Sequence, residues 1–255
     1  SLDTDLRNAL REALIAHWTH HSTALEGNTL TLGDTMFVLQ EGLTVSGKPL
    51  KDHQEVVGHA RAITLLQGLL EHKRIITEYD LFTLHKAVQV EKVVDIYAPI
   101  GAWKNEINGR NFVNPDTGRM MYRPYAAPKA VPQLMAEWLA KLNRFIEGPP
   151  LDLEKAPAIY AELHFDFVTI HPFADGNGRL ARLLSNLPLL SSGLPPIVIP
   201  REQRKLYLET LLVAQQANDQ DDMPYADLPA TNLGDFVEFC RTCYADTQAL
   251  VRDYH

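Results

Sequence analysis

Residues 171–182 bring together side chains that are suited to the chemistry of phosphate groups. The segment reads HPFADGNGRLAR, so a histidine, an aspartate, an asparagine between two glycines and two arginines follow one another closely. Apolar residues up to position 170 predict one buried helix, and residues 179–190 predict a second. The glycines therefore lie in a loop at a helix start, where backbone N–H groups without helical acceptors attract anions. This pattern predicts a phosphate-binding loop.

The polar side chains of the segment have complementary roles in such a site. Arg179 and Arg182 are three residues apart, so they share one helix face and can both bind phosphate oxygens. Asp175 is a hard carboxylate, which is a ligand type that Mg²⁺ takes beside phosphates. His171 can accept the proton of an attacking hydroxyl at neutral pH. Each residue type alone is more often structural, and their combination indicates a site. The other phosphate-binding positions that we expect are Gly176, Asn177 and Gly178.

The rest of the chain predicts a helical scaffold. Apolar residues recur at helical spacing almost everywhere, which predicts about eight helices and an all-α fold. Thr31 and Thr77 each precede an aspartate by three residues, a pattern that caps helix starts. Residues 97–128 differ, because glycines, prolines and short apolar runs around a turn predict a β-hairpin. A long irregular segment in a helical domain is more often functional than inert, so we interpret it as a flap.

Composition excludes other classes of function. The net charge of -8 and the pI near 5.7 lack the basic excess that nucleic-acid-binding proteins carry. No apolar run reaches the length of a membrane span, and the charged N-terminus is unlike a secretion signal, so we expect a cytoplasmic protein. Because the chain begins with serine, we expect it to be a piece of a longer protein.

Two groups of metal-binding residue types lack the partners that a metal site needs. Cys240 and Cys243 supply at most half of a tetrahedral zinc set, so we interpret them as ordinary thiols in a reducing compartment. His17, His20 and His21 have no accompanying acidic or cysteine set, and we interpret them as a polar helix face.

Residues 171–182 resemble the signature of the Fic family, HPFxDGNGRxxR, and match it at every fixed position. The resemblance implies an all-α Fic fold with a central helix–loop–helix, and transfer of AMP from ATP to Ser, Thr or Tyr hydroxyls of target proteins. It also implies that His171 is the general base, that Phe173 is a buried anchor and that Asp175 binds Mg²⁺ or Mn²⁺. By the same resemblance, Asn177 and the loop amides bind the α-phosphate of ATP, and Arg179 and Arg182 bind its phosphates.

Residues 22–30, STALEGNTL, resemble the inhibitory motif of the family subclass that carries an N-terminal inhibitory helix in the same chain. A plainer interpretation is a helix end, with Gly27 as the terminating residue and Glu26 as a solvated charge. The complete signature at 171–182 favours the inhibitory role. Glu26 would then pair with Arg182 and leave ATP in an unproductive pose. We therefore divide the chain into an inhibitory segment, 1–30, packed as one unit with a catalytic domain, 31–255.

The flap resembles that of the family with one departure. Its start, GAWK at 101–104, keeps an aromatic residue as Trp103 but has Lys104 where family members often have arginine. A lysine is a point charge and lacks the planar fork of arginine. If the flap docks the target as an added strand, Met121 and Tyr122 are the expected clamp residues.

Further positions follow from the resemblance with less specificity. Tyr207 and Asn218 are expected near the adenine, although a surface tyrosine and a helix-end asparagine explain them equally well. A homodimer through an exposed apolar helix face, as in similar family members, also stays open.

Three other functions remain compatible with the same residues. Glu26 can serve as the base that activates water, so that the enzyme removes AMP from a modified protein or runs both reactions. The loop recognises phosphate and not a base, so UMP or phosphocholine transfer is also open. A catalytically idle regulatory module is a third alternative, against which stands the intact set of catalytic residue types.

Overall fold

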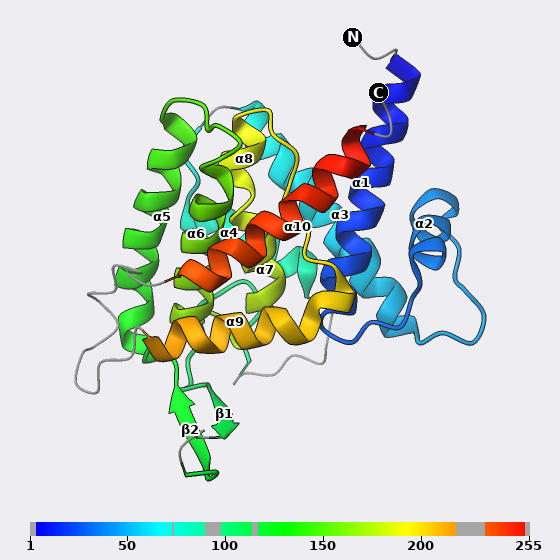
Figure 1. The fold of residues 1–255 in the computed structure, drawn as a ribbon. Coiled ribbons are helices and arrows are strands. Elements are labelled where there is room, and N and C mark those ends of the chain that lie inside the picture. Colours follow the sequence, from blue (N-terminus) through cyan, green and yellow to red (C-terminus); the bar gives the residue numbers. More distant parts are fainter. Residues whose placement is uncertain (1–3, 73, 90–97, 114–116, 218–232, 253–255) are drawn as a thin grey trace.

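The computed structural model of this chain describes residues 4–72, 74–89, 98–113, 117–217 and 233–252. Within them the chain forms a helical bundle from which one β-hairpin protrudes, and this confirms the expected all-α fold (Figure 1). The helices are α1 (Thr4–Ala24), α2 (Leu32–Glu41), α3 (Leu50–Glu71), α4 (Glu78–Val88), α5 (Val131–Glu147), α6 (Ala156–Ile170), α7 (Asn177–Leu184), α8 (Leu187–Ser191), α9 (Arg204–Ala217) and α10 (Gly234–Arg252).

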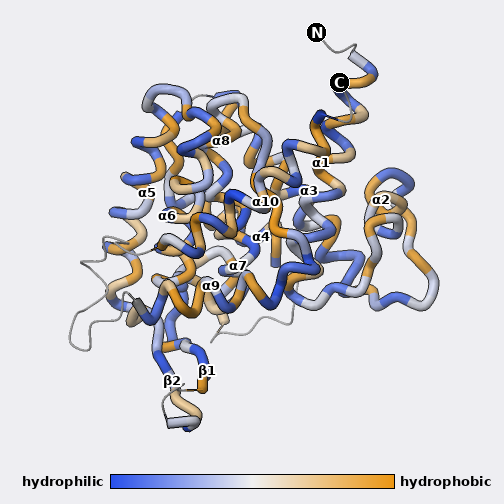
Figure 2. Tube along the Cα trace, viewed as in Figure 1, coloured by the Kyte–Doolittle hydropathy of each residue, from blue (hydrophilic) through white to orange (hydrophobic). Residues whose placement is uncertain are grey.

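Helix α6 forms the centre of the bundle. It contacts α5, α7, α8 and α10, and its aromatic side chains Tyr160, Phe165 and Phe167 are fully buried. The helices around it turn apolar residues inwards and polar residues outwards, as the alternating colours along α5 illustrate (Figure 2). Because every residue from Leu163 to Ile170 is buried, the C-terminal part of α6 is held in the core and fixes where the loop at 171 begins.

Residues 179–190 do not form the single helix that we predicted. The helix stops after α7 and restarts as α8, since Pro188 has no N–H to continue the pattern of helical hydrogen bonds. Asn186 fills the break, because its side-chain amide donates to the carbonyl oxygens of Arg182 and Ile197 at 2.9 Å. The short α7 is thereby a separate unit whose first turn faces the loop.

Helix α1 runs along α3 and also contacts α2 and α7. Its chain reverses after Ala24, and Gly27 adopts φ 99°, which non-glycine residues rarely do. The predicted caps of the next helices are both present: Thr31 and Asp34 form a capping box at α2, and Thr77 and Asp80 form one at α4.

The predicted hairpin consists of β1 (Gly109–Val113) and β2 (Met120–Pro124). The strands are antiparallel, with Gly109 opposite Pro124 and Val113 opposite Met120. Figure 1 shows the hairpin extending away from the helices, so its outer residues are exposed.

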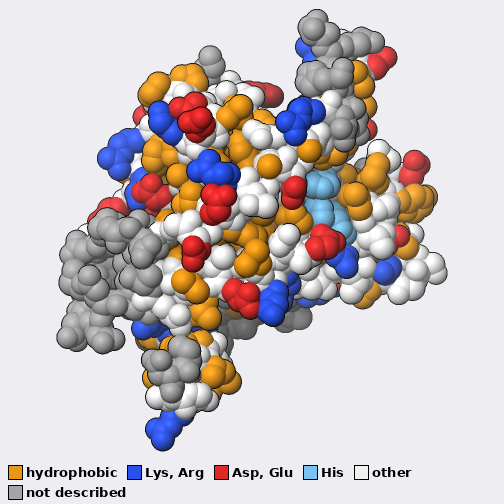
Figure 3. Space-filling model, viewed as in Figure 1, with side chains coloured by type: hydrophobic (Ala, Val, Ile, Leu, Met, Phe, Trp, Pro, Cys, Tyr) orange, Lys and Arg blue, Asp and Glu red, His pale blue; other side chains and the backbone are white. Residues whose placement is uncertain are grey.

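Acidic and basic side chains alternate on the face shown in Figure 3 without a basic patch. Among the described helices, none combines the length and the apolar character that crossing a membrane requires.

Candidate active site

His171 ends α6 in the left-handed conformation, with φ 53° and ψ 61°. It is the one residue other than glycine with positive φ among those that the structure describes. Such backbone strain persists where the surroundings enforce it. The imidazole stacks on Tyr125, with centroids 3.9 Å apart, and its Nδ1 lies 3.1 Å from the carbonyl oxygen of Val168. Since a carbonyl only accepts, Nδ1 carries the proton and Nε2 presents a lone pair, as a general base requires.

The pKa of His171 is lowered to about 4, mainly by burial, while its hydrogen bond to Val168 opposes the shift and Lys104 adds to it. Lys104 is 3% exposed. Its ammonium group donates to Oδ1 of Asn108 at 2.6 Å and to the carbonyl oxygen of Ile170 at 3.4 Å. The neighbouring cation therefore helps to keep His171 unprotonated at neutral pH.

The buried ring of Phe173 and the hydrogen bonds of the Asn177 side chain hold the loop 171–176 in place. Phe173 is fully buried, as expected for an anchor. The Asn177 side chain accepts from the backbone N–H of Phe173 at 2.9 Å and donates to the Phe173 carbonyl at 2.8 Å. This side chain is therefore committed to the loop, and the expected role of Asn177 at the α-phosphate stays a prediction for its backbone N–H.

Helix α4 holds the loop and the start of α7 through hydrogen bonds. His85 bridges the backbone N–H of Gly101 and the carbonyl of Asp175, at 2.8 and 3.0 Å. Arg179 donates from Nη1 to the carbonyl oxygen of Val88 at 2.7 Å. One guanidinium nitrogen of the predicted phosphate ligand is thus occupied by α4, and its Nη2 lies 3.6 Å from Asp175.

The side chain of Asp175 is exposed at the mouth of the loop. Its Oδ1 accepts from the N–H of Gly176 at 2.7 Å, and its relative side-chain exposure is 60%. No three His, Cys, Asp or Glu side chains gather in the described part of the chain in the way that an all-protein metal site needs. One accessible carboxylate still fits Mg²⁺, which usually takes one or two protein carboxylates together with phosphates and water.

Arg182 lies behind the loop, 2% exposed, and all three of its guanidinium nitrogens have acceptors. Nε donates to Oγ of Ser22 at 3.0 Å, and Nη2 donates to the Ser22 carbonyl at 3.0 Å and to Oε1 of Glu26 at 2.6 Å. Nη1 lies 3.4 Å from the hydroxyl of Tyr207. The structure therefore brings together the predicted pair, Glu26 and Arg182, and adds two partners that the sequence did not indicate.

The position of Glu26 follows from the turn after α1. Asn28 anchors this turn to α3 by donating to the carbonyl of Asp52 at 2.9 Å, and Arg204 of α9 donates to the carbonyl of Leu25 at 2.9 Å. The carboxylate then reaches the first turn of α7: a Cβ at Gly178 would lie 2.7 Å from Oε1 of Glu26. Only glycine leaves room for this approach.

Electrostatics favour the charged pair. Burial alone would raise the pKa of Glu26, but Arg182 outweighs it, and the pKa is lowered. Burial alone would lower the pKa of Arg182, and Glu26 outweighs it in turn, so that pKa is raised. Both groups are therefore charged across the neutral pH range.

Residues 75–189, which contain this site, match the Fic/DOC family. The chain contains a Fic domain. Protein adenylyltransferase fic-1 of Caenorhabditis briggsae is 29% identical over 253 residues, which are 98% of this chain and 43% of the relative. Protein adenylyltransferase Fic of Drosophila willistoni is 33% identical over 224 residues, covering 86% of this chain and 40% of the relative. The chain thus spans less than half the length of these curated relatives.

The Fic fold extends over nearly the whole chain. A crystal structure of a Fic-domain-containing signaling protein from Bacteroides thetaiotaomicron superposes with a TM-score of 0.82 at 28% identity, and the match covers 97% of this chain and 89% of that one. Helix α1, which lies outside residues 75–189, is therefore part of the matched fold.

The expectation that Tyr207 and Asn218 lie near the adenine stays a prediction. Tyr207 is 4% exposed, and its hydroxyl bonds to Nε2 of His164 at 2.9 Å as well as to Arg182. The ring is buried, and its hydroxyl both accepts a hydrogen bond from Arg182 and donates one to His164. Tyr207 therefore supports Arg182 and is not a surface tyrosine. Asn218 lies outside the described residues.

The flap residues fall into two groups. Trp103 lies at the base of the flap, where it packs on Phe82 and Phe173 and donates to Glu78 at 2.8 Å. Met121 and Tyr122 lie on β2 and are 44% and 55% exposed, so they are accessible to a target. Their role as clamp residues stays a prediction.

The three histidines of α1 are more enclosed than the polar helix face that we expected, and only His17 is half-buried rather than buried. His20 and His21 are buried, and Nδ1 of His21 accepts from the N–H of Arg201 at 3.0 Å. His21 must then carry its proton on Nε2, which lies 3.1 Å from Nε2 of His17. That proton occupies the position a metal would need. Histidine side chains reach the surface over α1 in Figure 3.

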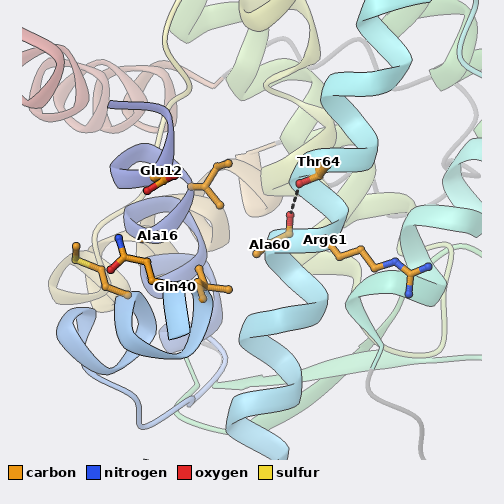
Figure 4. A pocket seen from close by; sticks show the side chains of 9 residues that line it. Glu12, Ala16, Gln40, Ala60, Arg61 and Thr64 are labelled. Atoms are coloured by element: carbon orange, nitrogen blue, oxygen red, sulfur yellow. Dashed lines mark hydrogen bonds between the residues drawn. The ribbon is translucent and has the colours of Figure 1, made fainter. Parts of the chain in front are cut away.

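A separate cavity of about 450 Å³ lies between α1, α2 and α3 (Figure 4). Glu12, Gln40, Arg61 and Thr64 supply its polar lining, and none of the predicted site residues lines it.

Proposed function

We propose that this Fic domain transfers AMP from ATP to a hydroxyl group of a protein, and that Glu26 restrains it. The observation that carries the proposal is the arrangement around Arg182 of α7. Its guanidinium is bound to Ser22 and Glu26, while the base, His171, lies at the start of the loop that precedes α7. The names of the relatives, protein adenylyltransferases, support AMP as the transferred group.

The reaction needs one proton acceptor and one anion site. The target hydroxyl gives its proton to Nε2 of His171 as its oxygen forms a bond to the α-phosphorus, and the bond from that phosphorus to the β-phosphate oxygen breaks, so pyrophosphate leaves. The first N–H groups of α7 and the guanidinium of Arg182 stabilise the phosphate oxygens. Asp175 would hold Mg²⁺, which would neutralise phosphate charge.

Glu26 opposes this reaction in two ways. Its carboxylate occupies the donor of Arg182 that a phosphate oxygen would use, at 2.6 Å. It also places a negative charge beside Gly178, where a phosphate would approach the helix start. ATP that binds with Glu26 in place therefore meets repulsion and loses one arginine ligand.

One observation favours hydrolysis as a second function of Glu26. The side chain is 43% exposed and its pKa is lowered, so a carboxylate oxygen is both charged and accessible to water. A water that gives one proton to Glu26 could then form a bond to the phosphorus of an AMP-modified protein. The bond from phosphorus to the protein oxygen would break, so AMP would leave and the protein oxygen would take up a proton to become a hydroxyl again. Adenylylation and its reversal use the same anion site.

The test is Glu26→Gly with ATP labelled at the α-phosphate. Labelling of the protein itself should rise at least tenfold over wild type, since losing a charge-assisted bond to Arg182 corresponds to about 1.5–3 kcal/mol. Glu41→Gly, an exposed glutamate at the end of α2, is the matched control and should change nothing. Glu26→Gly combined with His171→Ala should bind ATP without transfer. Equal labelling in all variants contradicts the proposal, whereas release of AMP that wild type performs and Glu26→Gly does not would assign hydrolysis.

A further inference from the structure

His85 connects the base of the flap to the phosphate-binding loop. It lies in the last turn of α4, is 1% exposed and stacks on Phe173 with centroids 4.0 Å apart. Nothing in the sequence pattern distinguishes it from the other apolar-face positions of α4. Its two ring nitrogens, however, both bond to backbone groups of segments on which the proposed reaction depends.

Those two bonds determine the tautomer of the ring. The N–H of Gly101 donates to Nδ1 at 2.8 Å, so Nδ1 has a lone pair and no proton. In the neutral ring the proton is then on Nε2, which donates to the carbonyl oxygen of Asp175 at 3.0 Å. The Gly101 contact thereby selects the form of His85 that can hold the loop.

The carbonyl of Asp175 belongs to the peptide group that also contains the N–H of Gly176. In a planar trans peptide the carbonyl and the N–H point in opposite directions. Because His85 draws the carbonyl towards α4, the N–H of Gly176 points away from α4, to the open side of the loop. There it donates to the Asp175 carboxylate at 2.7 Å, so the direction is one in which a negatively charged oxygen is already bound.

The packing of Gly176 fixes this peptide further. Gly176 has φ 82°, and a Cβ at this position would lie 2.7 Å from the amide nitrogen of Gln89 and 3.5 Å from the ring of His85. The same turn of α4 holds Arg179 through the carbonyl of Val88 at 2.7 Å. Two hydrogen bonds from the last turn of α4, together with the close packing of Gln89 on Gly176, therefore orient the loop at the start of α7.

We propose that His85 is a positioning residue that aims the N–H of Gly176 at an anionic phosphate oxygen of the nucleotide, which the Asp175 carboxylate replaces when no nucleotide is bound. This inference rests on the proposed function in one respect only, namely that the loop binds phosphate. Binding of a nucleotide would move Asp175 off the N–H and release its carboxylate towards the metal.

Two substitutions separate the hydrogen bond from the packing of the ring. In a Glu26→Gly background, His85→Gln keeps an N–H donor at the reach of Nε2, and His85→Asn keeps a polar group only at the reach of Nδ1. Both lose the stacking on Phe173, so their unfolding temperatures should fall together. Calorimetric titration with ATP and MgCl₂ should show His85→Gln within about threefold of its parent and His85→Asn weaker by about tenfold or more.

Equal ATP affinities of His85→Gln and His85→Asn overturn the proposal. If His85→Asn does not fold, the ¹⁵N shifts of the His85 ring in wild type give the answer: a proton on Nε2 before and after addition of ADP and MgCl₂ supports the proposal, and a proton on Nδ1 contradicts it. A Glu26→Gly parent that binds ATP without transferring AMP refutes the proposed function but leaves this comparison valid.

Discussion

Arg182 of α7 donates a hydrogen bond from Nη2 to Oε1 of Glu26 over 2.6 Å, although the two residues are 156 positions apart in the sequence. The same guanidinium also bonds to Ser22 and Tyr207. Arg182 thus links the end of α1 to the loop that we propose as the phosphate site, and its partners decide whether it is available to a nucleotide.

Ser22→Ala should release part of the activity. The change removes the Oγ that accepts from Nε of Arg182 but leaves the Ser22 carbonyl and Glu26 in place. Loss of one acceptor of a buried charged donor weakens the restraint, and we expect a gain in labelling from ATP of up to about tenfold, below that of Glu26→Gly. Ser191→Ala, which removes a hydroxyl that donates to Pro188 in α8, serves as control. A Ser22→Ala protein as inactive as wild type would contradict this role.

Tyr207→Phe should destabilise the fold. The missing hydroxyl leaves Nε2 of His164 without a partner in a fully buried site, which costs about 1–3 kcal/mol. For a chain of this size that corresponds to a lower unfolding temperature by roughly 2–4 °C per kcal/mol. Thermal unfolding followed by circular dichroism measures it, and Tyr79→Phe, at a position 75% exposed, should behave like wild type. An unchanged transition in Tyr207→Phe would show that the hydroxyl is not needed.

The transfer rate of Glu26→Gly should be insensitive to pH between about 8 and 5. A pKa of about 4 keeps His171 unprotonated over that range, and removal of the Glu26 charge lowers the pKa further. The acid limb of kcat/KM for labelling should therefore lie at or below about pH 4 and not at the ordinary pKa of histidine. Half-maximal rates near pH 6.5 would argue that His171 is more solvated than its burial indicates.

Lys104→Met should move that acid limb to higher pH. Removing the cation takes away a cause of the low pKa of His171, whereas burial, the larger cause, remains. Lys104→Arg keeps the charge and should leave the limb where it is. Identical pH profiles of the Met and Arg variants would exclude an electrostatic effect of Lys104.

Stability should decrease as the pH falls below 6.5. The pKa values of His59 and His164 are lowered to about 3, chiefly by burial, so the unfolded chain takes up protons below pH 6.5 that the folded chain does not. Each group then costs roughly 1.4 kcal/mol per pH unit below that point. Urea unfolding at pH 7 and 5.5 measures the loss. His59→Gln should reduce it, and His72→Gln, at the exposed end of α3, should not. Equal stability at both pH values would contradict the prediction.

The sequence by itself determined the features that depend on neighbouring residues. The loop 171–176, the start of α7 and the capping boxes at Thr31 and Thr77 follow from local spacing, because helix ends and glycine turns are set within a few residues. The paired strands at 109–113 and 120–124 follow for the same reason from the short apolar runs and the glycines and prolines of that part of the sequence. The break between Leu184 and Leu187 was missed because the apolar pattern around it continues through α8.

Only the tertiary structure decided which groups the loop residues use. Asn177 turns its side chain to Phe173, Arg179 gives one nitrogen to Val88, and His85 and Ser22 enter the site from helices that are distant in the sequence. These contacts arise because buried donors and acceptors must find partners wherever packing brings them together. The spacing of residues along the chain does not predict such long-range hydrogen bonds, because only the packing of the helices brings these residues together.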